Sequence, residues 1–238
     1  MLPNRQPDRT PPEPSRENWP ARLDFAGHTA PSIRPNPTKN RYARLDGRPA
    51  VSRQGTKRAL DCNLTMAVRT ILHYPDPRLR VPGRKVTALT QELRQLIDDM
   101  AETMYAAPGV GLAATQIGES WQIFVVDCAA EGEPSDFRVF VNPEILAENG
   151  RVSSDEGCLS FPGAREEVER AEGVRVKAQD QNGRWFELEA EGLLAVAIQH
   201  EYDHLQGVLM IDHLGPLKKR LLHRKMLRRP DTSSQAET

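Results

Sequence analysis

The chain has 238 residues, and its 32 basic and 33 acidic residues give a formal net charge of −1. A nearly neutral chain gives no reason to expect that the fold as a whole binds nucleic acid. No uncharged apolar run approaches the roughly 20 residues of a membrane helix, and the start lacks a secretory signal pattern. Three scattered cysteines favour a reducing compartment over a disulfide framework. We therefore expect a soluble cytoplasmic protein that does not bind membranes, and we expect it to be a monomer.

Residues 1–65 differ in composition from the rest of the chain. They are rich in Pro and Arg, poor in aliphatic residues and without periodicity, so we interpret them as a disordered extension. Because apolar patterning begins at Met66, this residue is a candidate for the true start, with the upstream segment misassigned. Organellar targeting stays open, although acidic residues argue against it: Asp8, Glu13, Glu17, Asp24 and Asp46. The folded domain is predicted at 66–229, followed by a polar tail at 230–238.

The first part of the predicted domain contains one helix and two strands. Residues 90–109, "TQELRQLIDDMAETMYAAPG", predict an amphipathic helix with Thr90 as N-cap, ended by Pro108 and Gly109. Next, "GVGLAATQIG" predicts a loop that contains glycine. The short apolar runs "WQIFVVD" and "FRVFVNP" predict buried strands, the second ended by Pro143.

The second part of the domain begins with a hairpin. The runs "GVRVKAQD" and "RWFELEA" flank an Asn-Gly turn, a strong hairpin signal. From Gly192 the pattern is helical, with one apolar stripe that ends in two histidines. A basic stretch, "GPLKKRLLHRKMLRR", predicts a last helix with an apolar side of Leu217, Leu221 and Leu222. Strands in runs between helices indicate an α+β fold, with antiparallel strands packed around the helix that begins at Gly192 and carries the two histidines, and with a C-terminal helix.

The segment "QHEYDHLQG" points most directly to a chemical function. On a helix, His200 and His204 lie on one face with Glu201 between them, as in hydrolytic metal sites. The alternative to a metal site is that His200 and His204 are core or interface histidines and that Glu201 is a solvated helix charge. The His-Glu-x-x-His pattern in an amphipathic helix favours the metal site, in which Glu201 acts as general base on a metal-bound water.

A catalytic metal of this kind takes three protein ligands and keeps one position for water. Gly207 fits one protease extension of the motif, but the last histidine of that pattern would fall at Met210, and His213 lies three residues late. The carboxylates that follow are too near or lie in the polar tail: Asp212, Asp231 and Glu237. We therefore expect the third ligand upstream of the helix.

Three thiols lie upstream of the helix. Cys62 falls in the N-terminal extension, and Cys128 ends an apolar strand, where a small hydrophobic residue is the usual role. Cys158 stands in "DEGCLSFPG", a turn-like stretch between strands. By position alone, Cys158 is either the third ligand or an inert buried thiol.

Three motifs stand in order along the chain: "GVGLAATQ" at 109–116, "EGCLS" at 156–160 and "QHEYDHLQG" at 199–207. Together they resemble the peptide deformylase family, from about Met66 to about Arg229. The resemblance implies that Cys158, His200 and His204 bind a metal and that Glu201 is the acid and base. It also implies that the Gln116 side chain and the Leu159 N–H stabilise the oxyanion of the tetrahedral intermediate.

The resemblance also implies a peptide-binding cleft. Gly111 would lie along this cleft and Arg165 near the bound chain. A methionine pocket would be lined by Val110, Leu193, Val196 and Ala197. Ser154 falls where relatives often carry an aliphatic pocket residue, which leaves the shape of the pocket open.

The activity implied is removal of the formyl group from N-terminal formylmethionine of newly synthesised polypeptides, with release of formate. The donor set suits iron, zinc, nickel or cobalt, and the resemblance favours ferrous iron. The ribosome would be a partner, with the basic C-terminal helix as a possible contact to ribosomal RNA; a solvated charged face is the alternative for this helix.

Two competing hypotheses stay open from the sequence. One is a metalloprotease that cleaves internal peptide bonds, which would yield peptide fragments and no formate. The other is a structural metal site in a ribosome-binding module, closed by Cys128 or His213 as fourth ligand. Under that second hypothesis, Glu201→Gln would change neither fold nor function.

Overall fold

The computed structural model describes residues 67–228. The expectations for residues 1–65, for Cys62 and Met66 and for the tail at 230–238 lie outside the described residues. The helices are α1 Gln91–Ala106, α2 Gly192–Leu205 and α3 Pro216–Leu227. The strands are β1 Gly111–Ala113, β2 Ile123–Asp127, β3 Phe137–Asn149, β4 Val152–Gly157, β5 Arg165–Arg170, β6 Gly173–Gln179 and β7 Trp185–Glu191.

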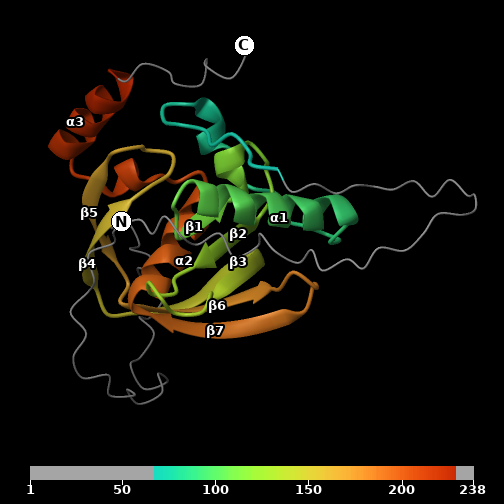
Figure 1. Ribbon diagram of the computed structural model, residues 1–238. Helices are drawn as coiled ribbons and strands as arrows, with labels where there is room; N and C mark the ends of the chain where they lie inside the picture. Colours follow the sequence, from blue (N-terminus) through green and yellow to red (C-terminus); the bar gives the residue numbers. More distant parts are fainter. Residues whose placement is uncertain (1–66, 229–238) are drawn as a thin grey trace, which may run out of the picture. The chain divides into compact units, whose positions relative to one another are not determined.

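The strands form two antiparallel sheets (Figure 1). A five-stranded sheet has the order β1-β2-β3-β6-β7, and a separate two-stranded sheet pairs β4 with β5. The predicted hairpin is confirmed, since β6 and β7 pair from Gly173 opposite Glu191 to Gln179 opposite Trp185. The α+β fold class with antiparallel strands, a central helix and a C-terminal helix is confirmed as well.

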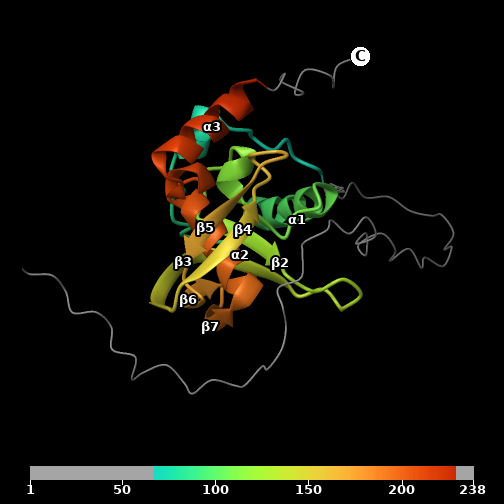
Figure 2. The same cartoon turned by 90° about the vertical axis from the view of Figure 1, so that its left-hand side faces the viewer.

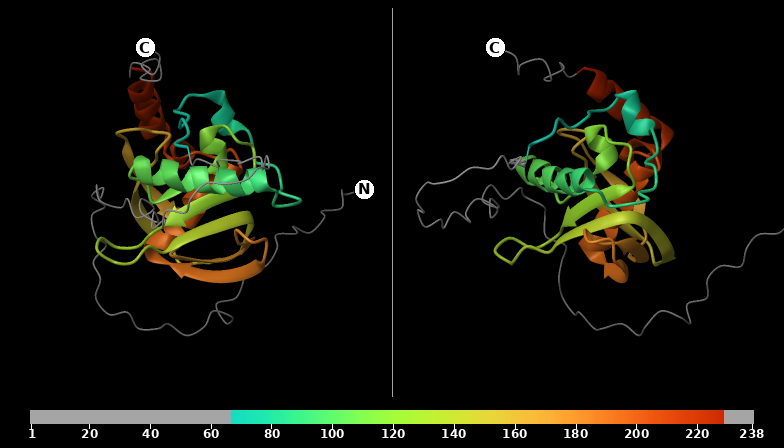
Figure 3. Two further views of the ribbon diagram at one scale, coloured as in Figure 1. Left: turned by 45° about the vertical axis from the view of Figure 1, so that its right-hand side comes forward. Right: turned by 90° about the vertical axis from the view of Figure 1, so that its right-hand side faces the viewer.

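The two longest helices cover opposite faces of the large sheet at β2. All five residues of β2 are buried, because its side chains alternate between two cores. Phe124 and Val126 pack in the cluster that contains α2, whereas Ile123 and Val125 pack in the cluster that contains α1. Figure 3 shows α1 running along one side of the sheet, and Figure 2 shows α3 near β4 and β5. The continuous apolar run of β2 is therefore explained by its position between two helices.

The prediction that Pro143 ends its strand is wrong. Strand β3 continues through Pro143 to Asn149, with a shift in its pairing with β6 between Val141 and Glu144. At this irregularity Asn142 has a positive φ of 52°, and its side chain bonds both the N–H and the carbonyl of Val86. Because a proline is tolerated at a bulge, where no ladder N–H is required, the strand resumes beyond it.

Two segments predicted as loop or turn contain strands. In "GVGLAATQIG", β1 pairs with β2, and a 3-10 helix follows at Ala114–Ile117. In "DEGCLSFPG", the first three residues end β4, which pairs with β5. Neither segment has an alternating pattern of its own, so the pairing depends on partner strands elsewhere in the chain.

The helices largely follow the predicted patterns. The Thr90 side chain caps α1 by accepting from the Leu93 N–H at 3.4 Å. In α3, however, Leu217 and Leu221 are 63% and 50% exposed, and the buried residues are Leu222 and Met226. Among residues 67–228, no helix has the length and hydropathy needed to cross a membrane.

A substitution at Gly207, just after α2, tests whether the close packing of its backbone contributes to stability. It has a φ of +72°, and a Cβ there would lie 2.6 Å from the Arg80 carbonyl oxygen. We expect Gly207→Ala to lower the free energy of unfolding by more than the roughly 1–2 kcal/mol that a left-handed alanine costs. Gly132→Ala is the control, since Gly132 has a φ of +88° and nothing within 4 Å. Equal losses in urea denaturation would contradict the predicted clash.

Candidate active site

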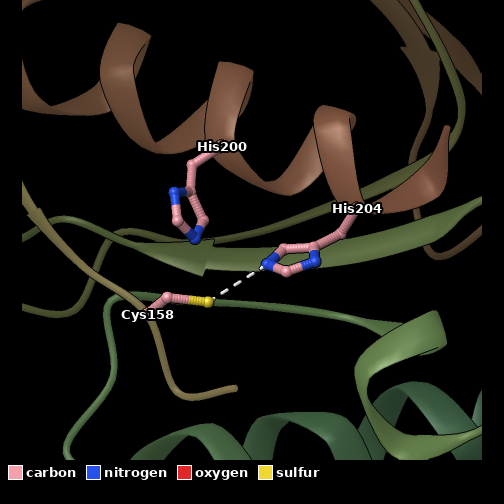
Figure 4. A group of neighbouring side chains, drawn as sticks. All are labelled: Cys158, His200 and His204. Carbon is pink, nitrogen blue, oxygen red and sulfur yellow. Dashed lines mark hydrogen bonds between the residues drawn. The ribbon is translucent and has the colours of Figure 1, made fainter. Parts of the chain in front are cut away.

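Helix α2 places two imidazoles on its buried face. His200 and His204 are one helical turn apart, and their ring centroids lie 5.1 Å from each other. Both residues are buried, His204 to within 1% exposure. Figure 4 shows both rings projecting from α2 toward Cys158. The helical spacing recognised in the sequence therefore brings two nitrogen ligands to one point.

Cys158 comes directly after β4 and completes the group. Its Sγ lies 3.3 Å from His204 Nε2, and the ligand atoms of Cys158, His200 and His204 all lie within 4.8 Å of one another. Across residues 67–228, this is the group whose His, Cys and acidic side chains could hold a metal ion. Met210, at the place of the last protease histidine, is buried in the core. His213 contacts Asp203 and is not part of the group.

The chemistry of this donor set fits a divalent transition metal. One sulfur and two imidazole nitrogens are typical ligands of zinc and of iron, cobalt or nickel. Burial lowers the pKa of His204 well below its usual range, which keeps the imidazole neutral with a lone pair available. Burial by itself also lowers the pKa of His200, but the negative charge of Cys158 and hydrogen bonds to Cys158 and Glu156 raise it. The site therefore favours a positive charge at this place, which a metal ion would provide.

Glu201 lies between the two histidines and is also buried. Burial, as the largest cause, raises the pKa of its carboxyl to about 7. No described residue donates a hydrogen bond to Glu201 Oε2. A Cβ at Gly111 would lie 2.4 Å from Glu201 Oε1, so the absence of a side chain at Gly111 makes room for the carboxylate. A carboxyl group with such a pKa can both accept and return a proton near neutral pH.

Gln116, in the 3-10 helix after β1, reaches the same place. Its Oε1 accepts from the Ala113 N–H at 2.8 Å, and its Nε2 lies 3.7 Å from Cys158 Sγ. Leu159 follows Cys158 directly in the chain, and its side chain lies close to Gly109. The first and second motifs are thus adjacent in space.

A second layer of charged residues lies behind the ligands, and the sequence did not predict it. Glu156 Oε2 lies 2.8 Å from His200 Nδ1, and Arg170 donates to both oxygens of Glu156 at 2.7 and 3.0 Å. Arg170 also donates to Asp203 at 2.6 Å, and Asp203 lies 2.7 Å from His213. Burial alone would raise the pKa of Glu156, but the hydrogen bonds from His200 and Arg170 lower it. Glu156 and Asp203 stand inside the motifs, whereas nothing in the sequence marks Arg170.

The predicted pocket residues come from three parts of the fold. Val110 immediately precedes β1 and Gly111 begins it, and the others on α2 precede His200: Leu193, Val196 and Ala197. Val196 and Ala197 are buried, and Leu193 is exposed. Arg165 starts β5, where it donates to the side chain and carbonyl of Asp155. Ser154 is half-buried in β4, on the same strand as Glu156.

Comparison with known proteins identifies the family. The family model described as polypeptide deformylase matches residues 68–220. The peptide deformylase of Alkalilimnicola ehrlichii is 51% identical over 161 residues, which cover 68% of this chain and 90% of the relative. The peptide deformylase of Chromobacterium violaceum is 49% identical over 164 residues, which cover 69% of this chain and 97% of that relative. The chain belongs to the polypeptide deformylase family.

Solved deformylase structures share the fold. The peptide deformylase of Legionella pneumophila aligns with a TM-score of 0.64 and 46% identity, over 69% of this chain and 100% of that chain. The peptide deformylase of Ehrlichia chaffeensis in complex with actinonin aligns with a TM-score of 0.66 and 35% identity, over 70% of this chain and 100% of that chain. The protein is therefore a hydrolase with a deformylase fold and a candidate metal centre.

The second layer generates a prediction about metal affinity. Glu156→Gln removes the negative charge that faces His200. It also leaves the buried positive charge of Arg170 without one of its two ion-pair partners, Glu156 and Asp203. We expect metal affinity to fall about 10- to 100-fold, as for other partners of metal-binding histidines, measured by competition with a chelator. Glu167→Gln, at an exposed position opposite Asp155 in β5, is the control. Equal affinities for the two variants would show that Glu156 does not support the metal centre.

Proposed function

We propose that this enzyme removes the N-formyl group from the formylmethionine at the start of newly synthesised polypeptides and releases formate. The observation that supports this most is the buried group of Cys158, His200 and His204 with Glu201 beside it, in a chain of the deformylase family. Because the substrate is a nascent chain, we place the reaction in the cytoplasm.

Cys158, His200 and His204 would hold one divalent metal ion, and we propose ferrous iron. Bound there, the metal would supply Lewis-acid chemistry, which makes water acidic enough to lose a proton near neutral pH. Zinc, nickel or cobalt suit the same donor set and could substitute. The Glu156 carboxylate orients the His200 ring by accepting from Nδ1, which leaves Nε2 for the metal.

Glu201 would move the proton. As carboxylate, Glu201 takes a proton from the attacking water while the formyl carbon becomes tetrahedral. It then returns the proton to the nitrogen of the leaving amine, because the amine must leave as a neutral group. The raised pKa of about 7 supports both steps, since the two forms of the carboxyl are close in free energy at that pH.

Gln116 and Leu159 would stabilise the oxygen of the formyl group as it becomes negative. The Gln116 Nε2 points at the sulfur of Cys158, beside the place where the formyl carbon must lie. The backbone N–H of Leu159 is the second donor. Donors of this kind contribute about 3–4 kcal/mol each in acyl-transfer enzymes, because charge develops at a site from which water is excluded.

The methionine side chain would enter between β1 and the first turns of α2. Val110, Leu193, Val196 and Ala197 present apolar atoms of suitable size, and Gly111, which leaves room for the Glu201 carboxylate, would lie along the peptide-binding cleft. Arg165, about half exposed beside Asp155, would meet the rest of the peptide. These assignments follow from the family motifs and from the position of the residues around α2.

The ribosome is the partner that we propose for α3. Its exposed surface carries Arg220 and Arg224, one turn apart, and three exposed leucines: Leu217, Leu221 and Leu227. Basic side chains at this spacing can contact successive phosphates of ribosomal RNA. The buried side of α3 packs through Leu222 and Met226, so this exposed face is available.

Formate release tests the reaction. The full-length protein, prepared without oxygen and supplied with ferrous iron, should release formate from an N-formylmethionyl peptide. We expect Glu201→Gln to lower kcat about 10²- to 10⁴-fold with unchanged metal content, since general acid and base catalysis is lost. Chelation of the metal should abolish activity, and iron should restore it.

The control for this experiment is Glu187→Gln, an exposed glutamate on β7. If the folded, metal-loaded wild type released no formate, the proposal would fail. Peptide fragments in place of formate would support the metalloprotease, and equal activity of Glu201→Gln and wild type would contradict the role of Glu201.

Ribosome binding is tested by co-sedimentation at several salt concentrations. We expect Arg220→Glu together with Arg224→Glu to weaken binding and to reduce its salt dependence, because phosphate contacts are lost. Arg184→Glu, an exposed change in the β6–β7 turn, should bind like wild type. Equal ribosome binding by both variants would show that α3 does not contact the ribosome.

A further inference from the structure

We propose that Ser160 is a positioning residue for the amide of Gln116. The inference rests on the proposed function, in which Gln116 donates to the formyl oxygen. Ser160 is fully buried, and its Oγ lies 3.2 Å from Gln116 Nε2. The hydroxyl thus contacts the group that would contact the substrate, and it acts only through that group.

The orientation of the Gln116 amide follows from its other contact. Its Oε1 faces the Ala113 N–H at 2.8 Å. Because a backbone N–H can only donate, the oxygen of the amide must lie on this side and the nitrogen on the side of Ser160 and Cys158. The hydrogen bond to Ser160 is therefore donated by Gln116 and accepted by the hydroxyl.

The number of hydrogens on Nε2 then determines what remains for catalysis. The amide nitrogen carries two N–H groups. One donates to Ser160 Oγ, and the other points toward Cys158 Sγ at 3.7 Å, on the side of the candidate metal centre. With contacts at both Oε1 and Nε2, the plane of the amide is held, and one N–H stays directed at the place of the formyl oxygen.

The hydroxyl itself sits on a rigid turn. The carbonyl of Ser160 accepts from the Tyr74 N–H at 2.9 Å, and the Phe161 N–H donates to the Cys158 carbonyl at 2.9 Å. The Phe161 ring is fully buried and stacks on Tyr74 with centroids 4.9 Å apart. This turn also contains Cys158, the proposed metal ligand, and Leu159, whose N–H is the proposed second donor. The hydrogen bond to Ser160 therefore holds the Gln116 amide against the segment that carries both groups.

Loss of the hydroxyl should therefore affect the transition state more than substrate binding. In Ser160→Ala one N–H of Gln116 loses its acceptor at a site from which water is excluded, and the amide can turn away. We expect kcat to fall about tenfold, the size of one hydrogen bond, with KM within about twofold and unchanged metal content. Ser160→Thr keeps the hydroxyl and should retain kcat within about threefold. A residue needed only for packing would tolerate the added methyl less well than alanine.

The deciding experiment is a double-mutant cycle on the full-length, iron-loaded protein. Formate release is measured for wild type, Ser160→Ala, Gln116→Ala and the double variant. We expect Gln116→Ala to lower kcat about 10²- to 10³-fold, and Ser160→Ala to add no further loss in that background. Thr103→Val is the control, since it removes a buried hydroxyl on α1 that contacts Asp99 and Arg69.

A second measurement does not depend on activity. In the zinc-loaded full-length protein, the side-chain N–H signals of Gln116 are assigned by their loss in Gln116→Ala. We expect Ser160→Ala to shift both signals and to speed their exchange with water, whereas Ser160→Thr and Thr103→Val should leave them in place.

The outcomes separate the inference from the proposed function. If Gln116→Ala leaves kcat unchanged, the role of Gln116 in the proposed function fails, and the inference fails with it. If Gln116→Ala is impaired but Ser160→Ala retains full kcat, or adds its full loss in the double variant, only the inference is overturned. Unchanged Gln116 signals in Ser160→Ala would overturn it as well.

Discussion

The candidate active site depends on one buried carboxylate, that of Glu156. It accepts from His200 Nδ1 and from Nε and Nη2 of Arg170, at distances of 2.7–3.0 Å. Burying a charge is costly unless it is paired, and removing one partner leaves the other uncompensated. Arg170 also pairs with Asp203 on α2. The small sheet of β4 and β5 is therefore held against the helix that carries the histidines, and Cys158, at the end of β4, is brought to them.

The surroundings of the two buried glutamates near the centre shift their pKa values in opposite directions, and this separates their roles. Hydrogen bonds from His200 and Arg170 lower the pKa of Glu156 despite its burial. For Glu201, burial is the largest cause and raises the pKa to about 7, because the lowering effects of the His200 and Arg170 charges and of the Ala113 N–H are smaller. Pairs of carboxylates whose environments move their pKa values apart commonly divide structural and proton-transfer roles. The pKa shifts favour a charged Glu156 beside His200, whereas Glu201 can change its protonation state near neutral pH.

The three motifs meet because α2 is packed against the large sheet, while its His200 and Asp203 contact Glu156 and Arg170 of the small sheet. Gly111, from the first motif, gives space to Glu201, from the third. Gln116, also from the first motif, contacts Ser160 and Cys158, from the second. Each motif therefore supplies groups that another motif needs, which explains why short segments far apart in the chain form one site.

The sequence by itself determined the parts that depend on local spacing. The apolar stripes predicted α1 and α2, the Asn-Gly turn predicted the β6–β7 hairpin, and the spacing of His200 and His204 predicted two ligands on one helix face. The candidate third ligand, Cys158, came from the resemblance of whole motifs. Only the tertiary structure decided that β3 continues past Pro143, that β4 pairs with β5 and that Arg170 supports Glu156. These features depend on contacts between residues that are distant in the chain. A local sequence pattern cannot predict with which strand a strand pairs or with which residue a buried charge forms an ion pair.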